Sequence, residues 1–252
     1  MEMNTRDSAE EAMRIVRAAE GEGAMLRLIG GFAIRFHCHG PHSIHLRAYH
    51  DIDLFGLRKE SKKIFSVFDK LGYSPNVRYN TIYGETRLQF IEQHSGKHVD
   101  VFLDKFRMQH TLDFRKRLRL DNLTIPITDL LLTKLQNVKL AAKDVKDIVA
   151  ILEDHEIGHI DDREVLNANY MAELCSSDWG LYKTITDNLS KIIKFIQEET
   201  FDARDKKELT GKLETIHESL KTKNKRIRWK LRSLIGDRIK WYEDVETGDW
   251  EV

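Results

Sequence analysis

The spacing of apolar residues changes at Pro126, and this change constrains the fold more than any other feature of the 252-residue sequence. Before Pro126, stretches that alternate apolar and polar residues, as a β-strand does, are interspersed with stretches at helical spacing. After it, apolar residues recur almost only every three or four positions, which is typical of helices. The sequence therefore predicts two domains, residues 1–125 with strands and helices and residues 126–252 with helices alone.

The first domain is predicted to be α+β, with helices packed on a mixed sheet. One helix is predicted from Ser8, which begins a capping-box pattern, and others over residues 32–38 and 61–71. Strands are predicted over residues 25–29 and 50–55, and in a hairpin formed by residues 86–91 and 98–103. In the second domain, Thr128 is predicted to cap a helix that continues to residue 138. Further helices are predicted over residues 145–152, 164–175, 181–199 and 206 to the end.

Composition excludes several classes of protein. The chain has 41 basic and 41 acidic residues, so its net charge indicates neither a nucleic-acid nor a membrane partner, and such a signal must be local. Only Cys38 and Cys175 are cysteines, which argues against a disulfide-stapled secreted fold. The polar start and the absence of a long apolar run predict a soluble cytoplasmic protein that does not cross a membrane.

Two short motifs in the first domain suggest phosphate chemistry. Gly30 and Gly31 lie between a predicted strand and a predicted helix, where backbone amides can approach a phosphate group. Asp51 and Asp53 lie on one strand with Ile52 between them, so both carboxylates are expected on the same face. Two like charges this close are costly unless a cation lies between them.

Asp100 is a candidate third carboxylate, because Val99 and Val101 flank it as core-facing residues on the returning hairpin strand. If this strand pairs beside the strand of Asp51 and Asp53, the three groups can hold two Mg²⁺ or Mn²⁺ ions. Such a site suits nucleotidyl transfer from a nucleoside triphosphate (NTP), in which metal ions and fixed geometry do most of the work. We expect Asp100 also to assist deprotonation of the attacking hydroxyl.

These motifs resemble the DNA polymerase β-type nucleotidyltransferase superfamily. The segments Ile29-Gly-Gly-Phe-Ala-Ile-Arg-Phe-His37 and His50-Asp-Ile-Asp-Leu54 are most similar to its minimal and abortive-infection toxin types, which belong to type IV toxin–antitoxin systems. The resemblance implies a polymerase β-like core, an NTP substrate, an acceptor such as tRNA or a protein, and a cognate antitoxin. Residues 47–50 depart from the family, because threonine or serine usually precedes the Asp-x-Asp pair.

A second block, residues 129–135 followed by 143–148, resembles the helical part of the toxin-type enzymes. The resemblance implies that Lys134 contacts the triphosphate and that Asp144 or Asp147 is its acidic partner. Spacing alone leaves simpler alternatives. Lys134 can be a solvated lysine beside a leucine stripe, Asp147 can pair with Lys143 one turn away, and Asp144 can favour the helix N-terminus.

The segment between the two glycines and the Asp-x-Asp pair is rich in histidine, with His37, His39, His42 and His45. A zinc site formed by these four is disfavoured, because no cysteine pair or regular helical spacing orders them. Contact with the nucleotide or its acceptor is the role we expect instead.

Basic residues concentrate in two stretches, residues 115–119 and 221–240. In the second stretch, Ile227, Leu231, Leu234 and Ile235 are predicted to face inward from an amphipathic helix whose cations are Arg226, Arg228, Lys230 and Arg232. Those cations can simply solvate a surface helix, or they can hold the phosphates of an RNA acceptor. The alternative to an enzyme is a non-catalytic RNA- or protein-binding module that retains the nucleotidyltransferase fold.

Overall fold

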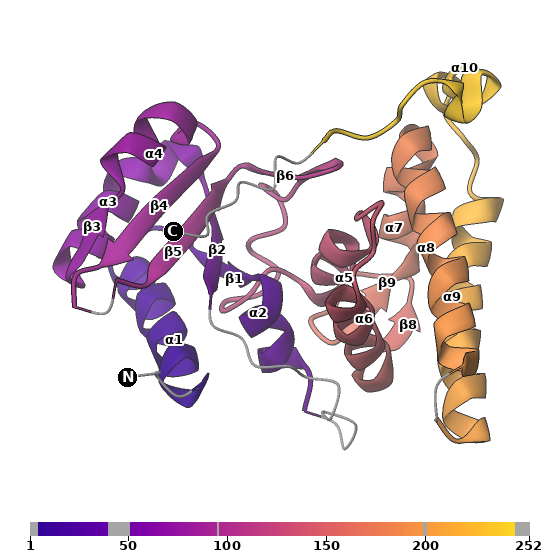
Figure 1. Cartoon of the computed structure of the whole chain (residues 1–252), viewed down its shortest axis with the longest axis horizontal. Helices are drawn as coiled ribbons and strands as arrows, with labels where there is room; N and C mark the ends of the chain where they lie inside the picture. Colours follow the sequence, from indigo (N-terminus) through magenta and orange to yellow (C-terminus); the bar gives the residue numbers. More distant parts are fainter. Residues whose placement is uncertain (1–4, 40–50, 95, 199–200, 245–252) are drawn as a thin grey trace.

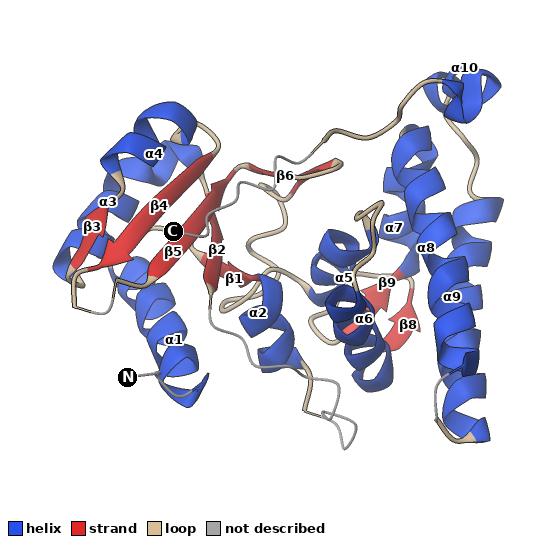
Figure 2. Ribbon diagram, in the orientation of Figure 1, coloured by secondary structure: helices blue, strands red, loops and turns tan. Residues whose placement is uncertain are grey.

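The computed structural model describes residues 5–39, 51–94, 96–198 and 201–244. It has the α+β architecture that the sequence predicts, a mixed sheet with packed helices followed by a largely helical C-terminal region. Figures 1 and 2 show the large sheet on one side of the molecule and the C-terminal helices on the other.

The central sheet has five strands in the order β1-β2-β5-β4-β3. Their bounds are Arg27–Ile29 (β1), Ile52–Gly56 (β2), Tyr73–Pro75 (β3), Arg87–Glu92 (β4) and His98–Leu103 (β5). Strands β2 and β5 run parallel, and the other neighbouring pairs are antiparallel. The hairpin strand β5 therefore lies beside β2, as the predicted carboxylate site requires.

One face of this sheet is apolar. Leu54, Val101 and Leu88 are register partners across β2, β5 and β4, and each is at most 2% exposed. The Phe68 ring of α3 stacks on Phe90, which shares the face of Leu88, with a centroid separation of 3.9 Å. Helix α3 thus covers the apolar face, and the alternate side chains of the central strands point to the other face.

Four helices accompany the sheet: α1 (Thr5–Gly21), α2 (Gly30–His37), α3 (Ser61–Lys70) and α4 (Val77–Tyr83), with a short 3-10 turn η2 (Arg58–Glu60) before α3. The prediction that Ser8 caps the first helix is wrong. Ser8 lies inside α1, and its hydroxyl accepts a hydrogen bond from Lys97 Nζ at 3.1 Å. Neither β3 nor α4 was predicted.

The segment between β5 and the helical region folds back against β1. It forms a small antiparallel pair, β6 (Lys105–Arg107) with β7 (Thr111–Asp113). Farther on, the Leu28 amide donates to the Leu123 carbonyl, and the Ile125 amide donates to the Leu28 carbonyl. The chain therefore enters α5 directly from the edge of the sheet.

The C-terminal region is helical apart from one short parallel strand pair, β8 (Glu156–Gly158) with β9 (Val165–Asn167). Its helices are α5 (Ile127–Leu135), α6 (Ala142–Asp154), α7 (Ala168–Ser177), α8 (Trp179–Glu198), α9 (Ala203–Thr222) and α10 (Ile227–Ile235), followed by a 3-10 turn η3 (Gly236–Arg238).

Two sequence predictions for this region are wrong. The helix predicted from residue 206 to the end is two helices, α9 and α10, separated at residues 223–226. Thr128 does not cap α5, because the chain enters that helix at Pro126. Its hydroxyl instead bonds the Val165 carbonyl and the Asn167 amide, which joins α5 to β9.

One continuous apolar core extends through both parts of the chain. Helix α2 contacts β1 and β2 on one side and α5 and α6 on the other, so it lies between the sheet and the helical region (Figure 1). The proposed domain boundary between residues 125 and 126 stays a prediction. Cys38 and Cys175 are buried free thiols.

Candidate functional site

Two carboxylates lie side by side on the face of the sheet opposite its apolar row. Asp53 of β2 and Asp100 of β5 are register partners on adjacent parallel strands. Neighbouring strands are about 4.8 Å apart, so the two side chains leave the sheet close together and in the same direction. Asp51 is exposed and immediately precedes β2.

This arrangement makes ionisation of Asp53 costly. Burial, followed by repulsion from Asp100, raises the pKa of Asp53 to about 6, and Asp51 adds to the repulsion. Arg87 and Lys134 oppose the shift without cancelling it. A divalent cation beside these carboxylates would favour the charged form, so the donor set fits Mg²⁺ or Mn²⁺.

Gly30 is required by the position of Asp53. It adopts a φ of +73°, and a Cβ built on it would lie 2.8 Å from Asp53 Oδ2. Any other residue would therefore combine backbone strain with a clash against the carboxylate. Gly30 and Gly31 begin α2, whose N-cap residue makes no side-chain cap bond, so the amides of the first turn can bind an anionic ligand.

Lys134 of α5 is buried, which rules out the solvated alternative. Its Nζ lies 3.2 Å from Asp144 Oδ1 and 2.8 Å from Asp147 Oδ2, both on α6. Asn137 also donates to Asp144 Oδ2 at 3.3 Å. The structure therefore brings Lys134 together with both aspartates that the family resemblance suggested.

These residues surround one pocket of about 390 Å³ between the sheet and the helical region. Its lining includes most of the residues predicted from the sequence: Gly30, Gly31, Asp51, Asp53, Lys134 and Asp144. The helical region adds Thr133, Gln136, Asn137 and Lys143 to the lining, and the sheet and the β6 segment add Ile29, Arg87, Phe102, Phe106 and Met108. Glycines, carboxylates and lysine are thus arranged around a space of the size that small-molecule ligands occupy.

The sequence reasoning missed Arg87 and Gln89 of β4. Arg87 Nη2 forms an ion pair with Asp100 Oδ2 at 2.9 Å, and Gln89 Nε2 donates to Asp100 Oδ1 at 3.4 Å. The Arg87 guanidinium also lies 4.4 Å from the centre of the Phe102 ring. The sequence feature that pointed to them is the alternation within the hairpin. Residues 87 and 89 lie on one face of β4, and they share that face with their partners on β5.

The four basic residues predicted to contact RNA do not line this pocket. Arg226 forms an ion pair with Glu173, and Arg232 donates to the carbonyls of Gly236 and Ile239. Arg228 and Lys230 are exposed, and no carboxylate of the described residues is seen to pair with either. Figure 1 shows α10 at the end of the helical region, apart from β2 and β5.

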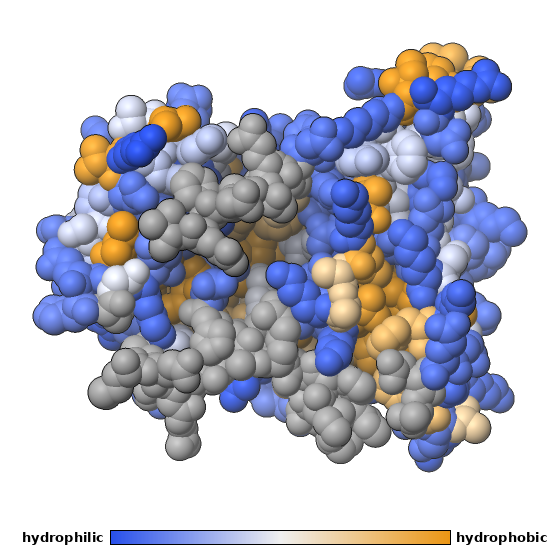
Figure 3. Space-filling view, viewed as in Figure 1, coloured by the Kyte–Doolittle hydropathy of each residue, from blue (hydrophilic) through white to orange (hydrophobic). Residues whose placement is uncertain are grey.

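The predicted inward orientation of the apolar residues of α10 is wrong. Ile227 is 76% exposed and Leu234 is 79% exposed, and Leu231 and Ile235 are also exposed. Hydrophobic and hydrophilic side chains adjoin on this helix in Figure 3. The inward contacts come instead from Trp229, whose ring lies 5.3 Å from that of Tyr182.

Only part of the histidine-rich segment belongs to the described structure. His42, His45 and residues 47–50 lie outside the described residues. His37 ends α2 at the end opposite Gly30, and His39 is exposed. Neither lines the pocket, and their expected contact with the nucleotide or its acceptor stays a prediction.

Within the described ranges, no helix combines the length and apolar character that crossing a membrane would require.

No protein-family model matches the sequence, and curated proteins give no match. Among solved structures, the chain is similar to the antibiotic-resistance factor ANT(2'')-Ia, with a TM-score of 0.38, 11% identity, and coverage of 58% of this chain and 83% of that chain. It is also similar to the lincosamide antibiotic adenylyltransferase LnuA in its lincomycin-bound form, with a TM-score of 0.41, 16% identity, and coverage of 56% of this chain and 94% of that chain. Both likenesses are distant, and the interpretation of the pocket therefore rests on its own residues.

Proposed function

We propose that the chain is a metal-dependent nucleotidyltransferase that transfers a nucleoside monophosphate from an NTP to an acceptor hydroxyl. The observation that carries this proposal is the register pair Asp53 and Asp100, of which Asp53 lines a pocket that the Gly30-Gly31 turn and Lys134 also line. Carboxylates that suit a divalent cation, next to amides and a lysine that suit phosphate, are the groups that nucleotidyl transfer requires.

Asp51, Asp53 and Asp100 would hold two Mg²⁺ or Mn²⁺ ions, which supply charge neutralisation on the phosphates and a lowered pKa for the attacking hydroxyl. The first-turn amides of α2 bind non-bridging phosphate oxygens, and Lys134 steadies the triphosphate. The acceptor oxygen bonds to the α-phosphorus, the bond to the β-phosphate bridging oxygen breaks, and pyrophosphate leaves. Asp100 assists removal of the hydroxyl proton.

Asp144 and Asp147 keep Lys134 in place, because each holds its Nζ within ion-pair distance. Asp144 also lines the pocket, where it can accept a hydrogen bond from the nucleotide. We assign Asp147, which is fully buried, to the positioning of Lys134 and not to direct contact with the substrate.

We further propose that the acceptor is an RNA, with tRNA the leading candidate and a protein side chain the next. The support is the exposed pair Arg228 and Lys230, which can contact phosphates. A toxin role, and with it a cognate antitoxin partner, rests on the resemblance of residues 29–37 and 50–54 to the toxin-type enzymes.

Incubation of the full chain with each labelled NTP, Mg²⁺, and bulk tRNA or cell lysate tests the activity. We expect label on one class of acceptor, with the loss of nearly all transfer in Asp53→Asn. Asp69→Asn is the matched control, because it removes the same charge from an exposed position on α3 and should transfer at the rate of the parent chain.

The competing possibility is a binding module without turnover. No transfer to any acceptor class with any NTP, together with unchanged RNA binding by Asp53→Asn, would overturn the enzymatic proposal. Transfer to protein or to a small molecule alone would reject the RNA acceptor while retaining the activity.

A further inference from the structure

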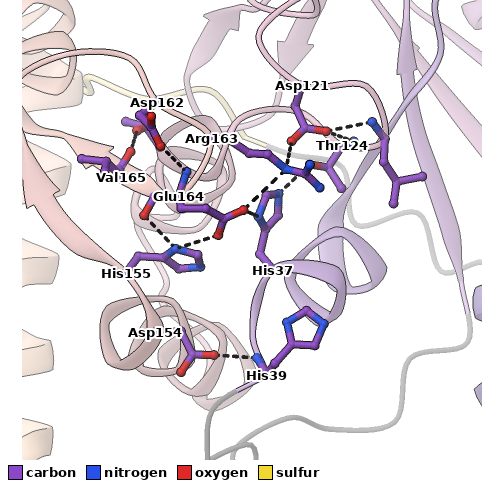
Figure 4. A network of polar contacts seen from close by, with 12 residues as sticks. His37, His39, Asp121, Thr124, Asp154, His155, Asp162, Arg163, Glu164 and Val165 are labelled. Carbon is purple, nitrogen blue, oxygen red and sulfur yellow. Dashed lines mark hydrogen bonds and ion pairs between the residues drawn. The ribbon is translucent and has the colours of Figure 1, made fainter.

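A second group of possible metal ligands lies away from the pocket. His37 is the last residue of α2, His155 directly follows α6, and Glu164 immediately precedes β9. One ligand atom from each lies within 4.8 Å of those of the other two. Figure 4 shows the two imidazole rings converging on the Glu164 carboxylate.

The separations are close to those of a bound ion. His37 Nδ1 is 3.9 Å from Glu164 Oε1, and His155 Nδ1 is 3.5 Å from Glu164 Oε2. Ligands at about 2.0–2.2 Å from a tetrahedral zinc ion are themselves roughly 3.3–3.6 Å apart. All three ligand atoms lie within 4.8 Å of one another, so side-chain movements of about an ångström would bring them into coordination.

The hydrogen bonding of His37 leaves one of its ring nitrogens able to coordinate a metal ion. Its Nε2 is 2.6 Å from the Thr124 hydroxyl, so a proton on Nε2 leaves the Nδ1 lone pair facing Glu164. Burial lowers the pKa of His37, which keeps the imidazole in the neutral form that binds metals. Such an outer hydrogen bond is how metal-ligating histidines are usually oriented.

His155 is held close to Glu164. Its side chain is 1% exposed, and its Nδ1 lies 3.5 Å from the carboxylate Oε2 and 3.1 Å from the carbonyl oxygen of Glu164. Its Nε2 is buried and has no hydrogen-bond partner among the described residues. No hydrogen bond to Nε2 therefore fixes the tautomer, and a proton on Nε2 leaves the Nδ1 lone pair facing Glu164.

We propose that His37, His155 and Glu164 bind one Zn²⁺ ion. Two imidazoles and one carboxylate are donors that zinc accepts, and the Glu164 side chain, 57% exposed, leaves room for water as the fourth ligand. The ion joins the ends of α2 and α6 to the segment before β9, and so fastens the sheet-bearing part of the chain to its helical part.

The only cation facing this group from the described residues is Arg163. Its Nε lies 3.5 Å from Glu164 Oε1 but 2.9 Å from Asp121 Oδ2. Asp121 Oδ1 accepts from the amides of Leu123 and Thr124, which fixes the carboxylate. Arg163 therefore has a closer partner of its own, and Glu164 can turn to the ion.

Zinc binding is measured on the full chain carrying Asp53→Asn, in excess Mg²⁺, so that the nucleotide pocket does not contribute. After chelation and dialysis, we expect one zinc per chain, and a visible spectrum of tetrahedral coordination when Co²⁺ replaces it. Zinc at about 100 times its Kd should raise the Tm by roughly 5–10 °C.

Glu164→Gln should weaken zinc binding at least tenfold, and it should fold normally because the side chain is exposed. Glu214→Gln, at an exposed site on α9, is its control and should bind like the parent chain. His155→Gln should bind no zinc, with exposed His159→Gln as its control. Equal zinc affinity and an equal Tm shift in Glu164→Gln and the parent, or octahedral Co²⁺ alone, would overturn the proposal. These readouts do not depend on nucleotidyl transfer.

Discussion

At the scale of single residues, Asp53 is more costly to ionise in the folded chain than in the unfolded chain. Its ordinary pKa is 3.8, and burial with the nearby Asp100 raises it to about 6 in the folded state. The folded state therefore holds this proton more tightly. The contribution of Asp53 to stability is present below about pH 4 and is lost as the pH rises through 6.

We predict that Asp53→Asn stabilises the metal-free protein while it abolishes transfer. A rise in the pKa of Asp53 from 3.8 to about 6 corresponds to roughly 3 kcal/mol, so we expect a gain of about 1–3 kcal/mol at pH 7.5 that shrinks toward pH 4. Chemical denaturation of both proteins across this pH range measures the difference.

Addition of Mg²⁺ provides the control for that prediction. Since the ion favours ionised Asp53, it should stabilise the parent more than the variant and narrow the gap between them. If the variant is less stable than the parent at pH 7.5, with or without Mg²⁺, ionisation of Asp53 does not carry the free-energy cost assigned to it.

The individual residues of the site were predictable to different degrees. Asp53 and Asp100 could be placed from alternation along single strands, because apolar neighbours fix which face each occupies. Arg87 could not be assigned to Asp100 from alternation alone, because their ion pair depends on the register between β4 and β5. Register is a property of two strands, and neither strand specifies it alone.

At the scale of elements, Arg117 ties three segments of the chain together. Its Nε donates to Asp129 of α5 at 2.5 Å. Its two terminal nitrogens each lie 3.0 Å from an oxygen of Asp161. Its guanidinium lies 3.6 Å from the centre of the Tyr170 ring on α7. Asp129 is fully buried, and burial raises its pKa to about 6 even beside the arginine. Arg117 thus holds an otherwise costly carboxylate inside the helical region.

We predict that Arg117→Met destabilises the fold by about 3–5 kcal/mol, because it leaves the Asp129 carboxylate buried without a counter-ion. Arg115→Met, which removes an exposed arginine paired with Asp113, should leave the Tm nearly unchanged. Thermal unfolding of the two variants gives the comparison.

A double variant separates charge from packing in that prediction. Asp129→Asn in the Arg117→Met background removes the unpaired charge and should restore part of the lost stability. If Asp129→Asn restores none of the lost stability, Arg117 stabilises the fold by packing against Tyr170, and the explanation from the unpaired Asp129 charge is wrong.

The elements that escaped prediction share a physical cause. Strands β3, β6, β7, β8 and β9 are three residues each, too short to show a period of two. Helix α4 exposes Val77, Ile82 and Tyr83, so it carries no buried apolar stripe. The break between α9 and α10 falls in Lys223-Asn-Lys-Arg226, which contains neither proline nor glycine to mark it.

At the scale of the whole molecule, the apolar residues of α10 show where a sequence pattern falls short. Their helical spacing is real, but Ile227 and Leu234 face away from the described core. A period of 3.6 indicates that a helix has an apolar face, and it does not indicate that the chain supplies a surface to cover that face.

The same helix gives a prediction for RNA binding. Arg228→Gln with Lys230→Gln should weaken RNA binding and reduce the slope of log affinity against log salt by about 1–2, because two phosphate contacts are lost. Lys59→Gln with Lys62→Gln removes the same charge from exposed positions near α3 and is the control. RNA binding measured over a salt series distinguishes them, and equal slopes for the two double variants would place the RNA elsewhere.

The contacts of Arg87 with Asp100 bear on the order in which substrates bind. Before any ligand binds, Arg87 already neutralises Asp100, and Lys134 lowers the cost of charge on Asp53. A lone Mg²⁺ must compete with these resident cations, whereas an ion that arrives with a triphosphate brings the negative charge that Arg87 and Lys134 can bind instead. We therefore expect the ion to enter as the metal–nucleotide complex, and Arg87 to exchange its carboxylate partner for a phosphate in the same event.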